Sequence, residues 1–133
     1  MRLYRGLREP YRADKAIALI RETGQGTDFT DCPFTALHYG SGRRGVVIVL
    51  DVPDDGPRVS EELFLGTGQQ AKRLMVWGRF DAFIVAEIPA RELRAEVRRK
   101  GVVTMAFEVK RGILERGIER HLELAARPAA THG

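Results

Sequence analysis

Residues Gly26 to Gly40 read G-T-D-F-T-D-C-P-F-T-A-L-H-Y-G, and this stretch decides the fold that we predict. Gly26–Thr30 combines a turn-forming glycine with threonine and phenylalanine, which strands tolerate well. Asp31 has the chemistry of a helix N-cap, because a short carboxylate can accept hydrogen bonds from the first free amides. Pro33 fits a first helical turn, where the missing amide hydrogen costs little. The stretch therefore predicts a strand, a tight turn and a short helix that ends at Tyr39.

Apolar side chains of this unit, Phe29, Phe34 and Leu37, are expected to share one side. Outside the unit, apolar runs predict strands over residues 3–7, 46–53, 82–89 and 102–109. Helices are expected over residues 13–21, 90–100 and 113–126, and residues 59–65 and 71–77 are compatible with either a strand or a helix. Strands and helices do not alternate strictly, so the pattern favours an α+β fold over a doubly wound sheet.

Length and composition indicate one domain over residues 1–127, followed by a disordered tail over residues 128–133. The net charge is +4, but Arg and Lys are scattered among Glu, so nucleic acid is a less favoured partner than protein. No apolar run reaches the ~20 residues that span a bilayer, and no signal peptide is evident, so a cytoplasmic protein is expected. Cys32 is the only cysteine, which excludes an internal disulfide, and no His/Cys cluster suggests a metal site.

Three segments stand out for their chemistry: Tyr4-Arg5-Gly6 at the end of the first strand, the central unit, and Asp81 before an apolar run. In this order and spacing they resemble the ADP-ribosyltransferase superfamily. The central unit carries the most specific part of the match, with Gly26, Phe29, Thr30, Asp31, Ala36 and Tyr39 in register with the family pattern. The resemblance covers roughly residues 3–89. It implies an ADP-ribosyltransferase-like fold of two small packed antiparallel or mixed sheets with flanking helices.

The resemblance also implies NAD as the substrate cofactor. The Gly6 backbone would pair with the nicotinamide carboxamide, Arg5 would bind a phosphate or ribose hydroxyls, and Tyr39 would stack on the nicotinamide ring. Cleavage passes through an oxocarbenium-like state that a carboxylate stabilises, and Asp81 is the expected carboxylate. The predicted catalytic residues are thus Asp81 and Arg5. The predicted cofactor-binding residues are Tyr4, Arg5, Gly6, Phe29, Thr30 and Tyr39.

The sequence departs from the family pattern at two places. In one class of the superfamily, the first of the two tyrosines that sandwich the nicotinamide stands at the position of Asp28. The ring of Phe29, Tyr11 or Trp77 would have to take the place of this tyrosine. The late carboxylate is Asp instead of Glu, and Arg79 stands where Glu or Gln often precedes it. Glu87, Glu61 and Glu62 are the alternatives to Asp81 as the reacting carboxylate. His38 and Cys32 are less favoured as site residues.

The predicted function is an NAD-dependent mono-ADP-ribosyltransferase, with NAD hydrolysis as a side reaction. It would transfer ADP-ribose to a macromolecular acceptor, protein before nucleic acid, as a toxin, effector or phage-type modifier does. Such a protein would act in the cytoplasm or be delivered into a host cytosol, and a neutralising partner protein would fit this role. The alternatives are a catalytically inactive binding module of the same fold and an NAD-using enzyme like the RNA 2′-phosphotransferases.

Overall fold

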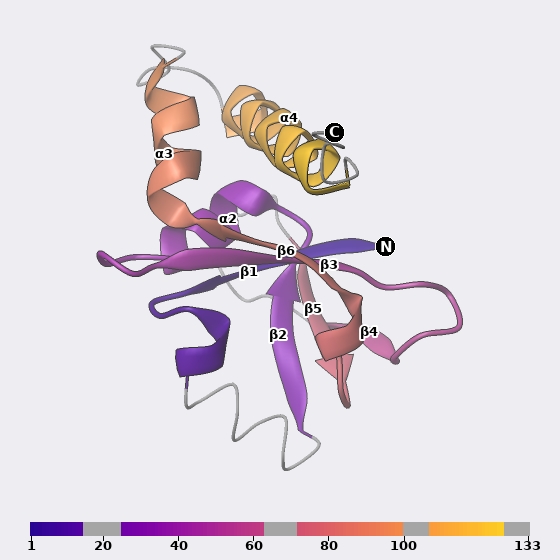
Figure 1. Cartoon of the computed structure of the whole chain (residues 1–133). Coiled ribbons are helices and arrows are strands. Elements are labelled where there is room, and N and C mark those ends of the chain that lie inside the picture. The colour runs from indigo at the N-terminus through magenta and orange to yellow at the C-terminus, as the bar shows by residue number, and fades with distance from the viewer. Residues whose placement is uncertain (15–24, 63–71, 100–106, 127–133) are drawn as a thin grey trace, which may run out of the picture.

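The computed structural model describes residues 1–14, 25–62, 72–99 and 107–126, which form an α+β fold (Figure 1). Six strands form one antiparallel sheet in the order β4-β5-β2-β1-β3-β6. The strands are β1 (Arg2–Leu7), β2 (Gly26–Thr30), β3 (Val46–Asp51), β4 (Val59–Glu62), β5 (Arg73–Trp77) and β6 (Ile84–Pro89). The helices are α2 (Pro33–Tyr39), α3 (Ala90–Arg99) and α4 (Phe107–Ala126), with short 3-10 helices η1 (Tyr11–Ala13) and η2 (Asp81–Phe83).

The sheet consists of two three-stranded halves that meet at a narrow junction. Strand β1 pairs with β3 over its whole length, from Arg2 opposite Asp51 to Leu7 opposite Val46. Strand β2 likewise pairs with β5 over its whole length. Between the halves, β1 and β2 are in register only at Tyr4 and Thr30. The expectation of two small packed sheets is therefore wrong, although in the described residues the strand register between the two halves is limited to this one residue pair.

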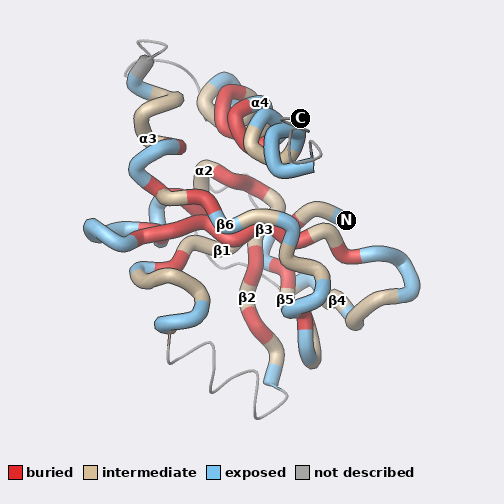
Figure 2. Tube along the Cα trace, in the orientation of Figure 1, coloured by how far each residue is buried: buried red, intermediate tan, exposed pale blue. Residues whose placement is uncertain are grey.

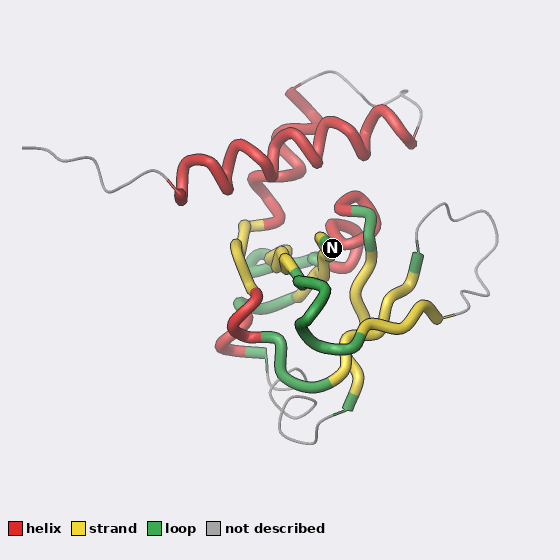
Figure 3. The backbone as a smooth tube through the Cα atoms, turned by 90° about the vertical axis from the view of Figure 1, so that its right-hand side faces the viewer, coloured by secondary structure: helices red, strands yellow, loops and turns green. Residues whose placement is uncertain are grey.

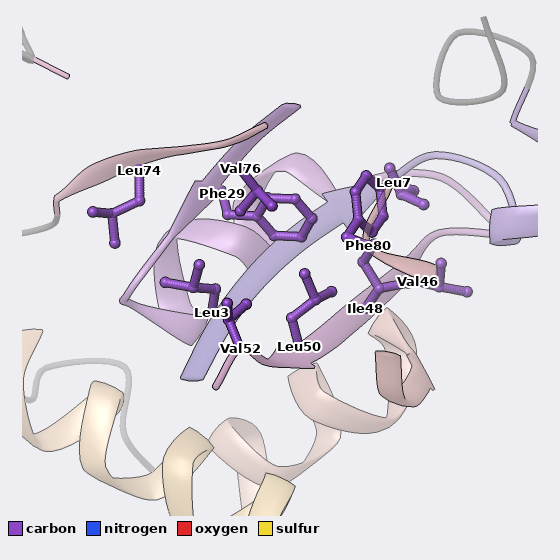
Figure 4. Close-up of a cluster of buried hydrophobic side chains, with 10 residues drawn as sticks. All are labelled: Leu3, Leu7, Phe29, Val46, Ile48, Leu50, Val52, Leu74, Val76 and Phe80. Atoms are coloured by element: carbon purple, nitrogen blue, oxygen red, sulfur yellow. The ribbon is translucent and has the colours of Figure 1, made fainter. Parts of the chain in front are cut away.

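One core lies on the sheet face away from the helices and takes side chains from both halves (Figure 4). The half around β2 contributes Phe29, Leu74 and Val76. Strands β1 and β3 contribute most of the rest, and Phe80 comes from the segment before η2. Strand alternation explains which strand residues enter this core, because residues two apart point to the same face of a sheet. Burial of these side chains against one another holds the two halves together where backbone pairing is sparse.

The second core lies between the sheet and the helices α2, α3 and α4, which cover one side of it (Figures 1 and 3). Val47 and Val49 of β3 point to this side, opposite to Ile48 and Leu50. Strand β3 is thus buried on both faces, as its continuous apolar run predicts, and it lies in the most buried part of the chain (Figure 2). Leu93 of α3 and Leu114 and Ile118 of α4 complete the core.

The structure confirms the strands predicted around residues 3–7, 46–53 and 82–89 and the helix over residues 90–100 in its described part. Where the sequence left strand or helix open, the described residues form the strands β4 and β5. The predicted strand over residues 102–109 is wrong at its end, because Phe107–Val109 begin α4. Helix α4, predicted over residues 113–126, therefore begins six residues earlier than expected, at Phe107. Most of the predicted helix 13–21 and the whole tail 128–133 lie outside the described residues.

Two details of the central unit differ from the prediction. The N-cap of α2 is Cys32 and not Asp31, whose carboxylate instead accepts a 2.9 Å hydrogen bond from the Lys72 amide. Phe29 does not share a side with Phe34 and Leu37, because β2 alternation turns it into the core on the opposite face. Pro33 does occupy the first helical turn, and the helix ends at Tyr39, as expected.

Candidate functional site

A cavity of about 540 Å³ opens at the junction of the two sheet halves. Past the Tyr4–Thr30 pair, β1 and β2 are no longer in register, and the space between them is bounded by α2 and by the start of β5. The lining residues are Tyr4, Arg5, Gly6, Leu7, Arg8, Asp14, Asp28, Phe29, Thr30, Thr35, Ala36, Tyr39, Lys72 and Arg73. All six residues predicted to bind the cofactor are among them. Segments far apart in the sequence thus converge on one site.

Gly6 allows α2 to lie directly against β1 at the edge of the cavity. A Cβ atom at this position would stand 1.9 Å from the Ala36 carbonyl oxygen and 2.5 Å from the Gly40 amide nitrogen. Both atoms belong to the backbone, which cannot move aside as a flexible side chain can. The absence of a side chain at Gly6 therefore sets the position of the last turn of α2, and with it that of Tyr39.

Arg5 bridges the gap between the two sheet halves. Its Nη1 donates a 2.7 Å hydrogen bond to the Asp28 carbonyl oxygen of β2, which β1 does not pair at this point. Its buried Nε has no hydrogen-bond partner among the described residues. Burial lowers the pKa of Arg5, and the negative charges of Asp28 and Asp14 partly oppose this shift. A guanidinium remains charged under these conditions, so Arg5 offers a buried donor to an anionic ligand.

Asp28 and Arg73 form an ion pair within the cavity lining. The guanidinium contacts both carboxylate oxygens, at 3.0 Å from Nε and 2.6 Å from Nη2. This hydrogen bond raises the pKa of Arg73 further above its ordinary value. With Arg8 and Lys72, the lining holds four cationic side chains against two carboxylates, so the cavity favours an anionic ligand.

Aromatic rings reach the cavity from α2 and β2. The Tyr39 side chain lies at the end of α2 and is 56% exposed, so its ring is available for stacking. Phe29 is almost fully buried and contacts Phe80 edge to face at 5.2 Å, so most of its ring belongs to the core. The Thr30 hydroxyl accepts a 3.1 Å hydrogen bond from the Cys32 amide, which shapes the turn into α2.

Asp81 does not lie with Arg5. It belongs to η2, before β6 and not within it, and its carboxylate accepts a hydrogen bond from the Tyr11 hydroxyl. Glu87 also contacts Tyr11, since its carboxylate accepts a 2.6 Å hydrogen bond from the Tyr11 amide. Neither acid is among the described residues that line the cavity, so Asp81, the carboxylate predicted to stabilise the oxocarbenium-like state, lies apart from the predicted cofactor-binding residues.

The other residues considered from the sequence also lie away from the cavity lining. Glu61 and Glu62 are on β4, Cys32 is buried before α2, and His38 is exposed on α2. Trp77, a possible replacement for the missing tyrosine, donates to the Ser60 hydroxyl and stacks under Arg58. The carboxylates that do line the cavity are Asp14 and Asp28. Sequence reasoning treated Asp28 only as a departure from the pattern, and its alternation with Thr27 and Phe29 is the signal that it faces away from the core.

Tyr4, at the junction, should make the stability of the fold depend on pH in the alkaline range. Burial raises the pKa of its phenol to about 12, above the ordinary value of 10. Stability from the neutral phenol is complete below pH 10 and is lost as the pH rises toward 12. Between pH 9 and pH 12, the free energy of unfolding of Tyr4→Phe should therefore fall by roughly 2–3 kcal/mol less than that of the parent chain. Chemical denaturation at each pH measures this difference. Equal losses in the two chains would contradict a buried, neutral Tyr4.

Among the described residues, no group of His, Cys, Asp and Glu side chains is arranged to hold a metal ion. None of the described helices is both long and apolar enough to cross a membrane. No protein-family model matches the sequence, and neither the curated proteins nor the solved structures include a match to this chain.

Proposed function

We propose that the cavity binds NAD and that the chain is an NAD-dependent mono-ADP-ribosyltransferase. One observation carries the proposal: the six residues selected from the sequence for cofactor binding all line a single cavity. They come from β1, β2 and α2, and the residue pair between the strands and the close contact at Gly6 bring these elements together. The cavity volume, about 540 Å³, lies within the range of roughly 300–1,000 Å³ of small-molecule sites.

The charges of the lining suit a dinucleotide. Arg5 is the buried donor for a phosphate, and Arg8, Lys72 and Arg73 supply further positive charge around it. Arginine suits this role because its planar guanidinium makes paired contacts with phosphate oxygens. The exposed Tyr39 ring is placed to stack on the nicotinamide.

Asp28 replaces Asp81 as the proposed reacting carboxylate. In the transfer step the bond between the ribose C1′ and the nicotinamide nitrogen breaks, and nicotinamide leaves with the electron pair. The negative charge of Asp28 stabilises the oxocarbenium-like ribose. A nucleophile of the acceptor then donates a lone pair to C1′ and loses its proton to solvent. Asp28 is held by Arg73 without ligand, and a bound pyrophosphate offers Arg73 an alternative partner.

The test is nicotinamide release from NAD by the purified chain, with and without cell lysate. We expect release that increases with lysate and that falls ~100-fold or more in Asp28→Asn, the size of effect seen when one stabilising group is removed. Asp81→Asn is the matched control, because it removes a carboxylate outside the cavity lining, and its release should stay within about twofold. Equal release by all three proteins would overturn the role of Asp28.

A second candidate is a binding protein of the same type that does not transfer ADP-ribose. The two-point pairing of Asp28 with Arg73 favours this candidate, because it occupies the carboxylate that the reaction requires. NAD at ~100 times its Kd would then stabilise the fold by about 2.7 kcal/mol without any nicotinamide release. A melting temperature unchanged by millimolar NAD would contradict both candidates.

A further inference from the structure

We propose that a cationic surface beside the cavity mouth binds single-stranded nucleic acid. The surface, here called the arginine face, consists of Arg43 and Arg44 in the α2–β3 loop and Arg91, Arg94 and Arg98 on α3. Binding by this face does not depend on the proposed NAD chemistry. Its role as the place where a nucleic-acid acceptor docks does rest on the proposed function.

The charges of α3 are sorted onto two sides of the helix. Arg91, Arg94 and Arg98 follow one another at spacings of three and four residues, which places them in one stripe about 10 Å long. The acidic side chains point elsewhere: Glu92 lies 3.7 Å from His121, and Glu96 lies 2.7 Å from Arg120 of α4. Both acids of α3 thus have basic partners on α4.

Two contacts bring the α2–β3 loop against this stripe. The Ala90 amide donates a 2.9 Å hydrogen bond to the Gly45 carbonyl, and Arg94 Nη1 donates one of 3.3 Å to the Gly40 carbonyl. The loop accordingly reaches outward beside the first turn of α3 (Figure 1). Its Arg43 is exposed, and Arg44 forms an ion pair with Glu9 while its side chain remains 64% exposed.

Aromatic side chains lie at the same place. His38 and Tyr39 end α2 immediately before Gly40, their rings stand edge to face at 5.7 Å, and both residues are exposed. Exposed rings next to arginines are what single-stranded nucleic acid requires, because bases stack on rings while the backbone follows the positive charge. An acidic protein segment would use the charge but would not need the rings. Since Tyr39 also lines the cavity, a bound strand would pass its mouth.

The probe is a fluorescein-labelled 20-nucleotide single strand of mixed sequence, RNA and DNA in separate arms, measured by anisotropy without NAD. The α3 stripe is tested by Arg91→Gln/Arg98→Gln, which removes two exposed charges and keeps good helix formers. The control, Arg12→Gln/Arg79→Gln, removes the same charge from exposed residues of other segments. Omission of NAD separates a failure of this proposal from a failure of the transferase.

We expect the parent chain and the control to bind with a similar Kd, which rises about 100-fold between 50 and 200 mM salt for five phosphate contacts. The stripe variant should bind roughly 20-fold more weakly near 100 mM salt, with a salt dependence shallower by about 1.4 in the logarithmic slope. Equal weakening in control and stripe variant would overturn the proposal, since net charge alone would then explain binding. Displacement of the strand by an equal charge concentration of polyglutamate would also overturn it, in favour of an acidic protein partner.

Discussion

Gly6→Ala is expected to lower the free energy of unfolding by more than about 3 kcal/mol and the melting temperature by 10 °C or more. The added methyl group would lie 1.9 Å from the Ala36 carbonyl oxygen and 2.9 Å from the Tyr39 carbonyl carbon. Relief requires α2 to move away from β1, which separates buried groups such as Ala36 and Leu37 from the sheet. Urea denaturation followed by circular dichroism measures the loss.

Gly112→Ala is the control for this substitution. Gly112 lies within α4, and the closest atom to an added Cβ would be the flexible end of Arg116 at 3.3 Å. Alanine in place of a helical glycine should therefore stabilise the chain by roughly 0.5–1 kcal/mol. If Gly6→Ala proved as stable as the parent chain, the close approach of α2 to β1 described here would be incorrect.

Phe80→Ala is expected to cost about 3–5 kcal/mol, as large-to-small changes of buried aromatic residues do. Phe80 is 1% exposed and contacts Phe29 edge to face at 5.2 Å and Tyr11 at 6.1 Å. It fills the space between β2 and the other half of the sheet, so its removal weakens the contact that compensates for sparse backbone pairing (Figure 4). The free energy of unfolding from denaturant titration provides the measurement.

The neighbouring substitution Asp81→Asn provides the comparison. Asp81 is exposed in η2, so loss of its charge should change stability by less than about 1 kcal/mol. Because Phe29 also lines the cavity, Phe80→Ala should in addition weaken NAD binding, whereas Asp81→Asn should not. Similar losses of stability for both variants would contradict the assignment of Phe80 to the core.

Local patterns were sufficient to predict several elements of the fold. The continuous apolar run of β3 indicated a strand buried on both faces, and Pro33 and Tyr39 marked the first and last residues of α2. The pattern was misleading at Phe107–Val109, where aromatic and β-branched residues suggested a strand. Packing of Leu114 and Ile118 against the sheet favours a long helix there, and such tertiary contacts outweigh local propensity.

The candidate site was predictable where it depends on the backbone and not where it depends on long-range geometry. Arg5, Gly6 and Tyr39 are brought together by the pairing of Tyr4 with Thr30 and by the close contact of α2 at Gly6. These residues belong to the two segments that the sequence analysis singled out. The location of Asp81 depends on where the chain turns before β6, and no local pattern specifies that it bonds to Tyr11. The pairing of Asp28 with Arg73 depends on the register of β2 against β5, which only the folded chain fixes.

The junction at Tyr4 and Thr30 also bears on how the chain responds to occupancy. Because the cavity lining includes residues of β1 on one side and of β2 and β5 on the other, a molecule bound there would link the two half-sheets. Without it, amide groups along the opening can exchange with solvent through a local motion of one half against the other. Binding of a ligand is therefore expected to slow the hydrogen exchange of these amides.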